Sequence, residues 1–324
     1  MNVSIIAGGA GFVGSNLLTL LAKEDRKLMI LDNLSRGREE YLDYVRAAAP
    51  GRVHIINVDL SDRVATLCAF NASLNLGSVE EVWHLAANSD IPAGILDASV
   101  DLHDTFMTTF SILEAMKTHK IPTLHFASSS AIYGDLGGVP LYENIGPLLP
   151  ISNYGAMKLA SEALISAAAE SYLSRCNLFR FPNVVGVPAT HGVILDFINK
   201  LKIDGNRLDV LGDGTQQKAY LHVSDLVEAM MYVRSAPSLP KVFPVNIGPI
   251  DEGVTVRFIA ESVTERVSHN AVVYFGKGNK GWVGDVPKFQ YSVERLSEMG
   301  WSPKRNSALA VRQAIDEIAQ QEDF

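Results

Sequence analysis

Short apolar runs alternate with longer amphipathic segments from Val3 to about Asn183. Each run is apolar on both faces, which is typical of strands in a parallel sheet with helices packed on each side. The alternation therefore predicts repeated strand, helix, strand units and an α/β fold with a doubly wound parallel sheet. The predicted strands are Val3 to Ile6, Leu28 to Leu31, Val53 to Val58, Val82 to Ala86, Leu124 to Ala127 and Leu178 to Phe181.

The alternation loosens after Asn183. Two later segments, Ala219 to Val223 and Val242 to Ile247, look like members of a sheet, and Ser224 to Arg234 between them has the apolar spacing of a helix. We therefore expect residues 1–183 plus 219–248 to form a Rossmann domain. Residues 184–218 plus 249–324 would form a smaller C-terminal α/β lobe. Ligands of open α/β sheets bind at the carboxyl ends of the strands, so the site is expected there.

Composition excludes several classes of protein. The 324 residues carry a formal net charge of -8 with scattered basic residues, so we expect no nucleic-acid partner. No apolar run approaches the ~20 residues that span a bilayer, and no basic leader precedes the first strand. We therefore expect a cytoplasmic protein with no membrane association. The cysteines, Cys68 and Cys176, and the histidines lack metal-ligand spacing, so no bound metal is expected.

A glycine-rich turn, Gly8-x-x-Gly11-x-x-Gly14, follows the first predicted strand and opens a helix. Glycine permits a tight turn and a close backbone approach to a pyrophosphate, and the helix N-terminus offers free N–H groups. The turn therefore predicts a dinucleotide site. A structural turn without a ligand is the alternative on this motif alone.

Asp32 ends the second predicted strand, where a carboxylate accepts hydrogen bonds from the adenosine ribose. A carboxylate there repels the 2′-phosphate of NADP, so the expected cofactor is NAD, although nearby Arg36 leaves NADP open. Asp59 ends the third strand and either reaches the adenine or caps the next helix. His84, in the fourth strand, is expected to be a buried core histidine.

Tyr154 and Lys158 lie near the start of a predicted helix, Asn153 to Ala169, and their spacing puts them on one face. A lysine beside a tyrosine favours the phenolate, so we expect a lowered phenol pKa and a general acid and base near neutral pH. An exposed helical pair without a function is the alternative. Support comes from three serines, Ser128 to Ser130, which leave a buried strand and need hydrogen-bond partners there.

At this point the sequence resembles the extended short-chain dehydrogenase/reductase family, specifically its nucleotide-sugar epimerases of the UDP-glucose 4-epimerase type. The resemblance covers nearly the whole chain, in matching order and spacing. It rests on Gly8 to Gly14, Asp32-Asn33-Leu34, Asp59-Leu60, His84 to Ala87, Ser129 to Gly134, Tyr154 to Lys158, Arg180 to Gly186, Gly212 to Gln216, Tyr220 to Asp225, Asn246 to Gly248 and Met299 to Trp301.

The resemblance implies a role for each matching residue. Tyr154 would be the catalytic acid and base, Lys158 would hold the nicotinamide ribose, and Ser129 would bind the reacting sugar hydroxyl. The NAD contacts would come from Gly8, Gly11, Phe12, Val13, Gly14, Asp32, Asn33, Asp59, Leu60, Leu85, Ala86, Ala87, Tyr154 and Lys158, and the substrate contacts from Ser129, Ser130, Asn183, Val193, Lys218 and Phe289.

The chain departs from the family's pattern at the expected diphosphate contacts. Lys218 and Trp282 stand where the family usually has arginine. A lysine offers one mobile charge where arginine offers a two-pronged fork, so the phosphates must be held differently. Lys280 could compensate, although a solvated lysine is the alternative. The bulky Phe289 hints at a plain hexose as the sugar.

The family resemblance favours inversion at the sugar C4 through a transient 4-keto intermediate. Family dehydratases carry an acidic pair where this chain has Ser130 and Ala131, so dehydration is not expected. Another NAD-dependent nucleotide-sugar oxidoreductase or epimerase is the alternative, followed by a non-catalytic NAD-binding regulator, which would not need Ser129, Tyr154 and Lys158. Family members dimerise through helices equivalent to Leu102 to Met116 and Asn153 to Ala169, which implies a homodimer.

Overall fold

The structure is a computed structural model that describes residues 1–137, 139–278 and 291–324. The chain divides into two compact units, which are described separately below. The first comprises Met1–Gly134, Pro147–Arg180 and Met230–Val245, and the second comprises Asp135–Gly146, Phe181–Ala229 and Asn246–Phe324. The functions predicted for the two domains remain a proposal.

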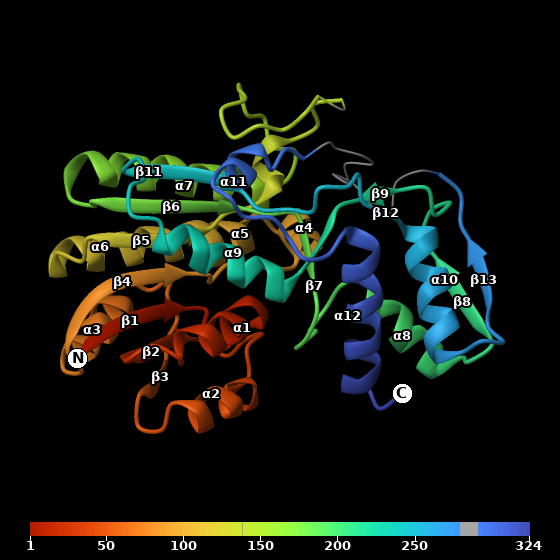
Figure 1. Ribbon diagram of the computed structural model, residues 1–324, viewed down its shortest axis with the longest axis horizontal. Coiled ribbons are helices and arrows are strands. Elements are labelled where there is room, and N and C mark those ends of the chain that lie inside the picture. Colours follow the sequence, from red (N-terminus) through yellow and green to blue (C-terminus); the bar gives the residue numbers. More distant parts are fainter. Residues whose placement is uncertain (138, 279–290) are drawn as a thin grey trace. The chain divides into compact units, whose positions relative to one another are not determined.

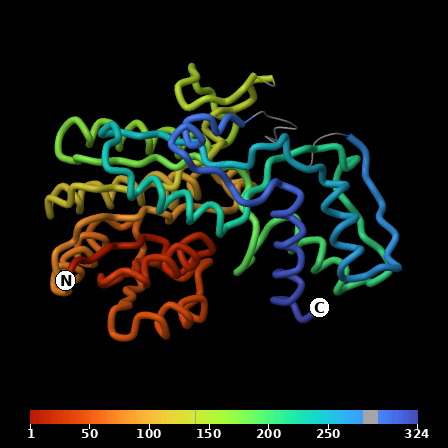
Figure 2. The backbone as a smooth tube through the Cα atoms, in the orientation of Figure 1, coloured from red at the N-terminus to blue at the C-terminus, as the bar shows by residue number. Residues whose placement is uncertain are grey.

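A seven-stranded sheet organises the first unit, with the strand order β11-β6-β5-β4-β1-β2-β3 (Figure 1). Strands β1 to β6 pair in parallel, and the order reverses at β1, which is the topology of a doubly wound nucleotide-binding sheet. The colour jump between β6 and β11 in Figure 2 shows that segments distant in sequence are neighbours. The strands are β1 Asn2–Ala7, β2 Arg26–Asp32, β3 Val53–Asn57, β4 Ser78–His84, β5 Thr123–Ala127, β6 Arg175–Arg180 and β11 Val242–Asn246.

Helices cover the sheet because each offers it an apolar face. Fully buried Ile112 and Met116 of α6 share one core cluster with Ile5 of β1 and Leu124 of β5. The predicted α/β doubly wound fold is therefore confirmed. The helices with residues in this unit are α1 Phe12–Leu21, α2 Asp43–Ala48, α3 Arg63–Leu74, α4 Ile91–Leu96, α5 Ala98–Asp101, α6 Thr108–His119, α7 Asn153–Ser171 and, in part, α9 Val223–Ser235.

Two segments of the first unit are tighter or wider than an α-helix. A 3-10 turn, Ser130–Tyr133, follows β5, and a π-helical segment, Leu102–Met107, joins α5 to α6. The helix predicted at Leu102 to Met116 therefore includes a π-helical stretch, a feature that often marks functional sites.

A buried ionic network crosses the central strands of the sheet. Glu81 of β4 accepts hydrogen bonds from Arg26 at 2.7 Å, from Arg234 at 2.8 Å and from Ser4 at 2.7 Å. Glu24 pairs with both arginines, so two cations face two anions. The hydrogen bonds from His125 and Arg234 hold the pKa of Glu81 far below its usual range despite its burial. This network explains how a strand can carry a glutamate in its centre.

The described residues of the second unit form three two-stranded sheets and a helical core. Strand β10 pairs with β7 and does not join the seven-stranded sheet, whereas the other late predicted strand does join it as β11. Helices α8, α10 and α12 share one buried cluster that includes Ile198, Ile259 and Val311. The elements are β7 Asn183–Val185, α8 Val193–Ile203, β8 Arg207–Val210, β9 Gln217–Lys218, β10 Tyr220–His222, β12 Val254–Thr255, α10 Val256–Val267, β13 Val272–Phe275, α11 Glu294–Glu298 and α12 Ser307–Gln321.

Across residues 1–137, 139–278 and 291–324, none of the helices combines the length and apolar character needed to cross a membrane.

Candidate active site

The glycine turn packs against the carboxyl end of β4 more closely than any side chain would allow. A Cβ on Gly8, whose φ is +79°, would lie 2.6 Å from the backbone nitrogen of Ala86. A Cβ on Gly14 would lie 2.3 Å from the backbone oxygen of Gly8. Helix α1 then begins at Phe12 with no side-chain cap on Gly11. The turn therefore leaves the helix N-terminus available to a phosphate group, as a dinucleotide site requires.

Asp32 is fixed at the end of β2 by the same turn. Its Oδ2 accepts a hydrogen bond from the backbone N–H of Ala10 at 2.9 Å, and its Oδ1 accepts one from Leu34 at 2.9 Å. Burial raises the pKa of Asp32, and these two hydrogen bonds oppose the rise. A carboxylate held this way keeps acceptor capacity for ribose hydroxyls. The chain's residues thus fit NAD at this end of the site.

The neighbouring predicted cofactor residues have local roles. Asn33 and Asp59 each accept hydrogen bonds from the backbone and hydroxyl of a serine two residues later. Asp62, and not Asp59, caps α3, so the capping alternative for Asp59 is wrong. Leu60 is buried in the core. Contact of these residues with a cofactor remains a prediction.

The residues that follow β4 lie beside the glycine turn. The backbone N–H groups of Leu85 and Ala86 donate to Ala7 at 2.8 and 3.0 Å, which ties this segment, with Ala87 following, to the end of β1. His84 is fully buried, and its Nε2 lies 2.8 Å from the hydroxyl of Thr109. His84 is thus buried in the core as expected, although within the described residues its Nδ1 has no hydrogen-bond partner.

Gly155 brings Tyr154 to the serines that follow β5. A Cβ on Gly155 would lie 2.4 Å from the backbone oxygen of Ala131, so α7 meets the Ser130–Tyr133 turn at backbone contact distance. Ser152 caps α7, and Ser129 accepts a hydrogen bond from the Ala131 N–H at 3.1 Å. The Ser129 hydroxyl is thereby close enough to the Tyr154 phenol to lower its pKa. The structure therefore brings these two predicted residues together.

Lys158 is 2% exposed and lies beside the same tyrosine. Its Nζ donates to the backbone oxygen of Ala127 at 2.6 Å and lies 4.7 Å from the centre of the Phe126 ring. The Tyr154 ring centre is 5.7 Å away. Ser129, Tyr154 and Lys158 thus converge at the carboxyl end of β5, where the sequence predicts the chemistry.

The expected lowering of the Tyr154 pKa is not what the structure shows. Burial raises this pKa to about 12, the Ser129 hydrogen bond opposes the rise, and the Asp101 carboxylate adds to it. Burial also lowers the pKa of Lys158 to about 7, against the pull of Glu162 and Asp101. A lysine with that pKa is only partly charged at neutral pH, so the sequence argument overestimated its effect on the phenol.

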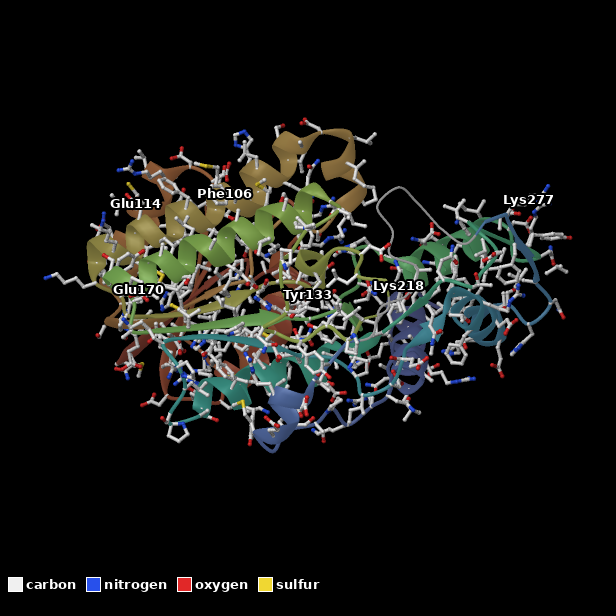
Figure 3. All side chains as sticks on the ribbon, turned by 90° about the horizontal axis from the view of Figure 1, so that it is seen from above. Phe106, Glu114, Tyr133, Glu170, Lys218 and Lys277 are labelled. Atoms are coloured by element: carbon white, nitrogen blue, oxygen red, sulfur yellow. The ribbon has the colours of Figure 1, made fainter. Side chains whose placement is uncertain are left out.

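A buried ion pair that the sequence analysis did not single out lies one turn beyond Lys158. Glu162 accepts hydrogen bonds from Arg180 Nε at 3.0 Å and Nη2 at 2.6 Å, and one from the Ser128 hydroxyl at 2.5 Å. Arg180 also donates to Tyr133, which lies inside the first unit in Figure 3. The i, i+4 spacing of Lys158 and Glu162 was the sequence signal that could have revealed Glu162. The Ser128 hydroxyl is therefore engaged with Glu162, whereas the predicted substrate contacts among the three serines are Ser129 and Ser130.

A second buried carboxylate, Asp101, ends α5. It is 0% exposed, its Oδ1 accepts from the Asn88 side chain at 2.9 Å, and its Oδ2 has no hydrogen-bond partner among the described residues. A Cβ on Gly94 would lie 1.8 Å from that Oδ2. No sequence motif marked Asp101, because its burial depends on packing between helices.

The predicted substrate residues Asn183, Val193 and Lys218 lie in the second unit. Asn183 begins β7 and is exposed, Val193 begins α8, and Lys218 lies in β9, paired with Val254 (Figure 3 marks Lys218). Their contact with a substrate remains a prediction. Lys280, Trp282 and Phe289 lie outside the described residues.

Comparison with known proteins agrees with the site. Residues 4–248 match the model of the NAD dependent epimerase/dehydratase family. A putative UDP-glucose 4-epimerase of Methanocaldococcus jannaschii is 25% identical, over 96% of this chain and 97% of its own length. A crystal structure of a UDP-galactose 4-epimerase is 31% identical, with a TM-score of 0.84 and 99% coverage of both chains. The Thermus thermophilus UDP-glucose 4-epimerase in complex with NAD is 28% identical, with a TM-score of 0.81 and 98% coverage of both.

These findings confirm the predicted resemblance and the predicted cofactor, NAD. The glycine turn and Asp32 fit that cofactor, and the convergence of Ser129, Tyr154 and Lys158 fits an enzyme. The chain therefore belongs to the NAD dependent epimerase/dehydratase family.

Proposed function

We propose that this enzyme inverts C4 of a nucleotide-diphosphate sugar through a transient 4-keto intermediate. The observation that carries the proposal is the convergence of Ser129, Tyr154 and Lys158 at the end of β5, beside a glycine turn built for a dinucleotide. The names of the similar proteins, UDP-glucose and UDP-galactose 4-epimerases, support the same reaction.

The proposed chemistry assigns one task to each residue. The glycine turn and Asp32 would hold NAD, which would supply a reversible hydride acceptor for the sugar C4. Tyr154, in its phenolate form, takes the proton of the C4 hydroxyl and gives it back to the inverted oxygen, which restores the phenolate. Ser129 donates to or accepts from that oxygen and so aligns it with the phenol. Lys158 supplies positive charge beside the phenol and holds the nicotinamide ribose. Because proton and hydride both return, no net oxidation results.

Dehydration is not part of the proposal. Water elimination needs an additional acid and base next to the catalytic hydroxyl, and Ser130 and Ala131 supply neither a carboxylate nor another ionisable group. Ser130 would instead contact the sugar. Asn183 and Lys218 would contact the diphosphate, and Val193 the nucleotide. A single lysine contact predicts phosphate binding that weakens readily with added salt.

A product assay tests the proposal directly. The purified protein is incubated with UDP-, GDP-, CDP- and dTDP-sugars without added reductant, and the products are separated. We expect at least one sugar to be converted to its C4 epimer, and Tyr154→Phe to abolish the conversion while leaving NAD bound. A panel in which no sugar is inverted, with or without added NAD, would contradict the proposal. Net oxidation of a sugar would indicate the alternative, an oxidoreductase.

We also propose that the enzyme works as a cytosolic homodimer. Figure 3 shows α6 and α7 side by side, the pair that the family resemblance assigns to the dimer interface. Leu102, which precedes α6, is 42% exposed. Both cysteines are free thiols, which fits a reducing compartment. A monomer in light scattering would contradict the dimer.

A further inference from the structure

The charge of Lys158 depends on groups outside the predicted motif. Its ammonium is buried and donates to a carbonyl, Ala127 O, and not to a carboxylate. Removing an ammonium from water without an anionic partner is costly, and the lysine responds by losing its proton more easily. In the proposed reaction this lysine must stay charged. Its environment must therefore contain a compensating negative charge.

Glu162 is the candidate for this negative charge that lies nearer to Lys158 in sequence, but it already pairs with a cation. Arg180 forms a two-pronged ion pair with it, and Ser128 donates to the same carboxylate. The Glu162 and Arg180 side chains are 6% and 7% exposed, so the pair is buried and close to neutral as a unit. Glu162 attracts the Lys158 ammonium more strongly than Asp101 does, but its pairing with Arg180 ties that charge to a second cation.

Asp101 is different because no cation balances it directly. Its Oδ1 accepts from a neutral amide, that of Asn88, and in the part of the chain that the structure describes its Oδ2 has no partner, although the residue is fully buried. An unsatisfied buried carboxylate oxygen is unusual in a folded protein and needs an explanation. The carboxylate lies against the Gly94 backbone, so close that any side chain at that position would meet its Oδ2.

The fold holds Asp101 against the catalytic helix. Asp101 ends α5, directly before the π-helical segment Leu102–Met107, and both segments pack on α7, which carries Tyr154 and Lys158. The Asn153 side chain donates to Gly94 O at 2.8 Å, which links the start of α7 to the same corner. Figure 3 shows Phe106 of the π-helical segment beside α7.

We propose that Asp101 is the counter-charge of Lys158, a positioning residue that keeps the lysine cationic and thereby sets the pH range of the Tyr154 and Lys158 pair. The inference rests on the proposed function, in which both residues act. The Asp101 carboxylate acts to raise the pKa of Lys158 and of Tyr154. Burial raises the pKa of Asp101 itself, and the hydrogen bond from Asn88 and the charge of Lys158 oppose that rise. The other titratable groups near Asp101, Lys158 and Tyr154 are the Glu162 and Arg180 pair, Asp104 and His84.

Asp101→Asn removes the charge, nearly preserves the shape and keeps an oxygen acceptor for Asn88. A negative charge favours the protonated form of both Lys158 and Tyr154, so its loss lowers both pKa values. Both limbs of the pH profile of kcat should therefore move to lower pH, by about one unit for one buried charge beyond ion-pair distance. A purely structural role would reduce kcat without moving either limb.

The matched control is Asp97→Asn. Asp97 is an exposed carboxylate at the other end of the same helix, where it caps α5, and asparagine caps helices equally well. Its pH profile should coincide with that of the unchanged enzyme. Asp101→Ser, which also removes the charge, serves as a second variant if the asparagine variant does not fold.

The deciding measurement does not depend on turnover. Lysine labelled with 13C at Cε is incorporated into the full-length protein, and Lys158→Arg identifies the Lys158 signal, whose chemical shift follows its protonation. We expect the Lys158 pKa to fall by about one unit in Asp101→Asn and to stay unchanged in Asp97→Asn. An unchanged Lys158 pKa in both Asp101 variants would overturn the inference. A shifted pKa in a protein that inverts no sugar would refute the proposed function alone.

Discussion

Gly155 directly follows the proposed catalytic tyrosine, and replacing it with alanine tests how closely α7 must approach the turn after β5. The added Cβ would lie 2.4 Å from Ala131 O and 3.0 Å from its carbonyl carbon, whereas ordinary contact begins near 3.4 Å. Both neighbours are backbone atoms and cannot rotate away. Helix and turn would therefore have to separate by about 1 Å, because a close-packed interior leaves no free space.

The sign of the change in the free energy of unfolding distinguishes this steric contact from the ordinary helix propensity of alanine. Alanine normally stabilises a helix by about 1 kcal/mol relative to glycine. Overpacking costs about 1–3 kcal/mol, so Gly155→Ala should lower the free energy of unfolding by up to about 2 kcal/mol. The same separation moves Tyr154 away from Ser129, and a misplacement of about 1 Å reduces turnover by about 100-fold.

The assay compares kcat, NAD affinity and urea unfolding for Gly155→Ala and for Gly146→Ala. Gly146 has open space where a Cβ would lie, so its alanine variant should match the unchanged enzyme. We expect Gly155→Ala to keep its NAD affinity and to lose most of its kcat. A Gly155→Ala variant that is more stable and retains kcat within about threefold, against the roughly 100-fold loss expected, would refute the reasoning.

Two further predictions concern the cofactor turn and the ionic network. Gly14→Ala places a Cβ 2.3 Å from the Gly8 backbone oxygen and should weaken NAD binding by about tenfold or more in a calorimetric titration. Unchanged affinity would show that the turn relaxes freely. Glu81→Gln leaves two arginines facing Glu24 alone and should lower the free energy of unfolding at pH 7 by about 3–5 kcal/mol, whereas Glu39→Gln, in an exposed pair, should cost under about 1 kcal/mol. Because the Glu81 pKa is lowered on folding, this difference should be complete at neutral pH and shrink as the pH falls below the ordinary glutamate range. A difference that grows in acid would contradict the network.

The strands that the sequence predicted well are those that are apolar on both faces. Val3 to Ile6 and Leu28 to Leu31 lie inside β1 and β2. The prediction for β4 began at Val82, whereas the strand begins at Ser78, because it contains Glu81. That glutamate is satisfied by Arg26 and Arg234, which are far away in sequence. Local patterns cannot reveal partners that only the tertiary fold supplies.

In the candidate site too, local patterns were predictable from the sequence and tertiary contacts were not. The sequence revealed the glycine turn Gly8 to Gly14, Asp32 and the Tyr154 and Lys158 pair, because their spacing along the chain is itself the signal. Asp101 was not, since its role depends on how α5 packs on α7. The Tyr154 pKa was mistaken for a related reason: spacing reveals a neighbouring lysine, but burial decides whether that lysine is charged.

The central claim is inversion at C4 with return of the same hydride. The most direct test is to incubate the enzyme with a UDP-hexose deuterated at C4 and to analyse the product by mass spectrometry and NMR. The account predicts the C4 epimer with deuterium retained at C4, formed more slowly than from the unlabelled sugar. Absence of the epimer, or an epimer that has lost its deuterium to the solvent, would contradict the account.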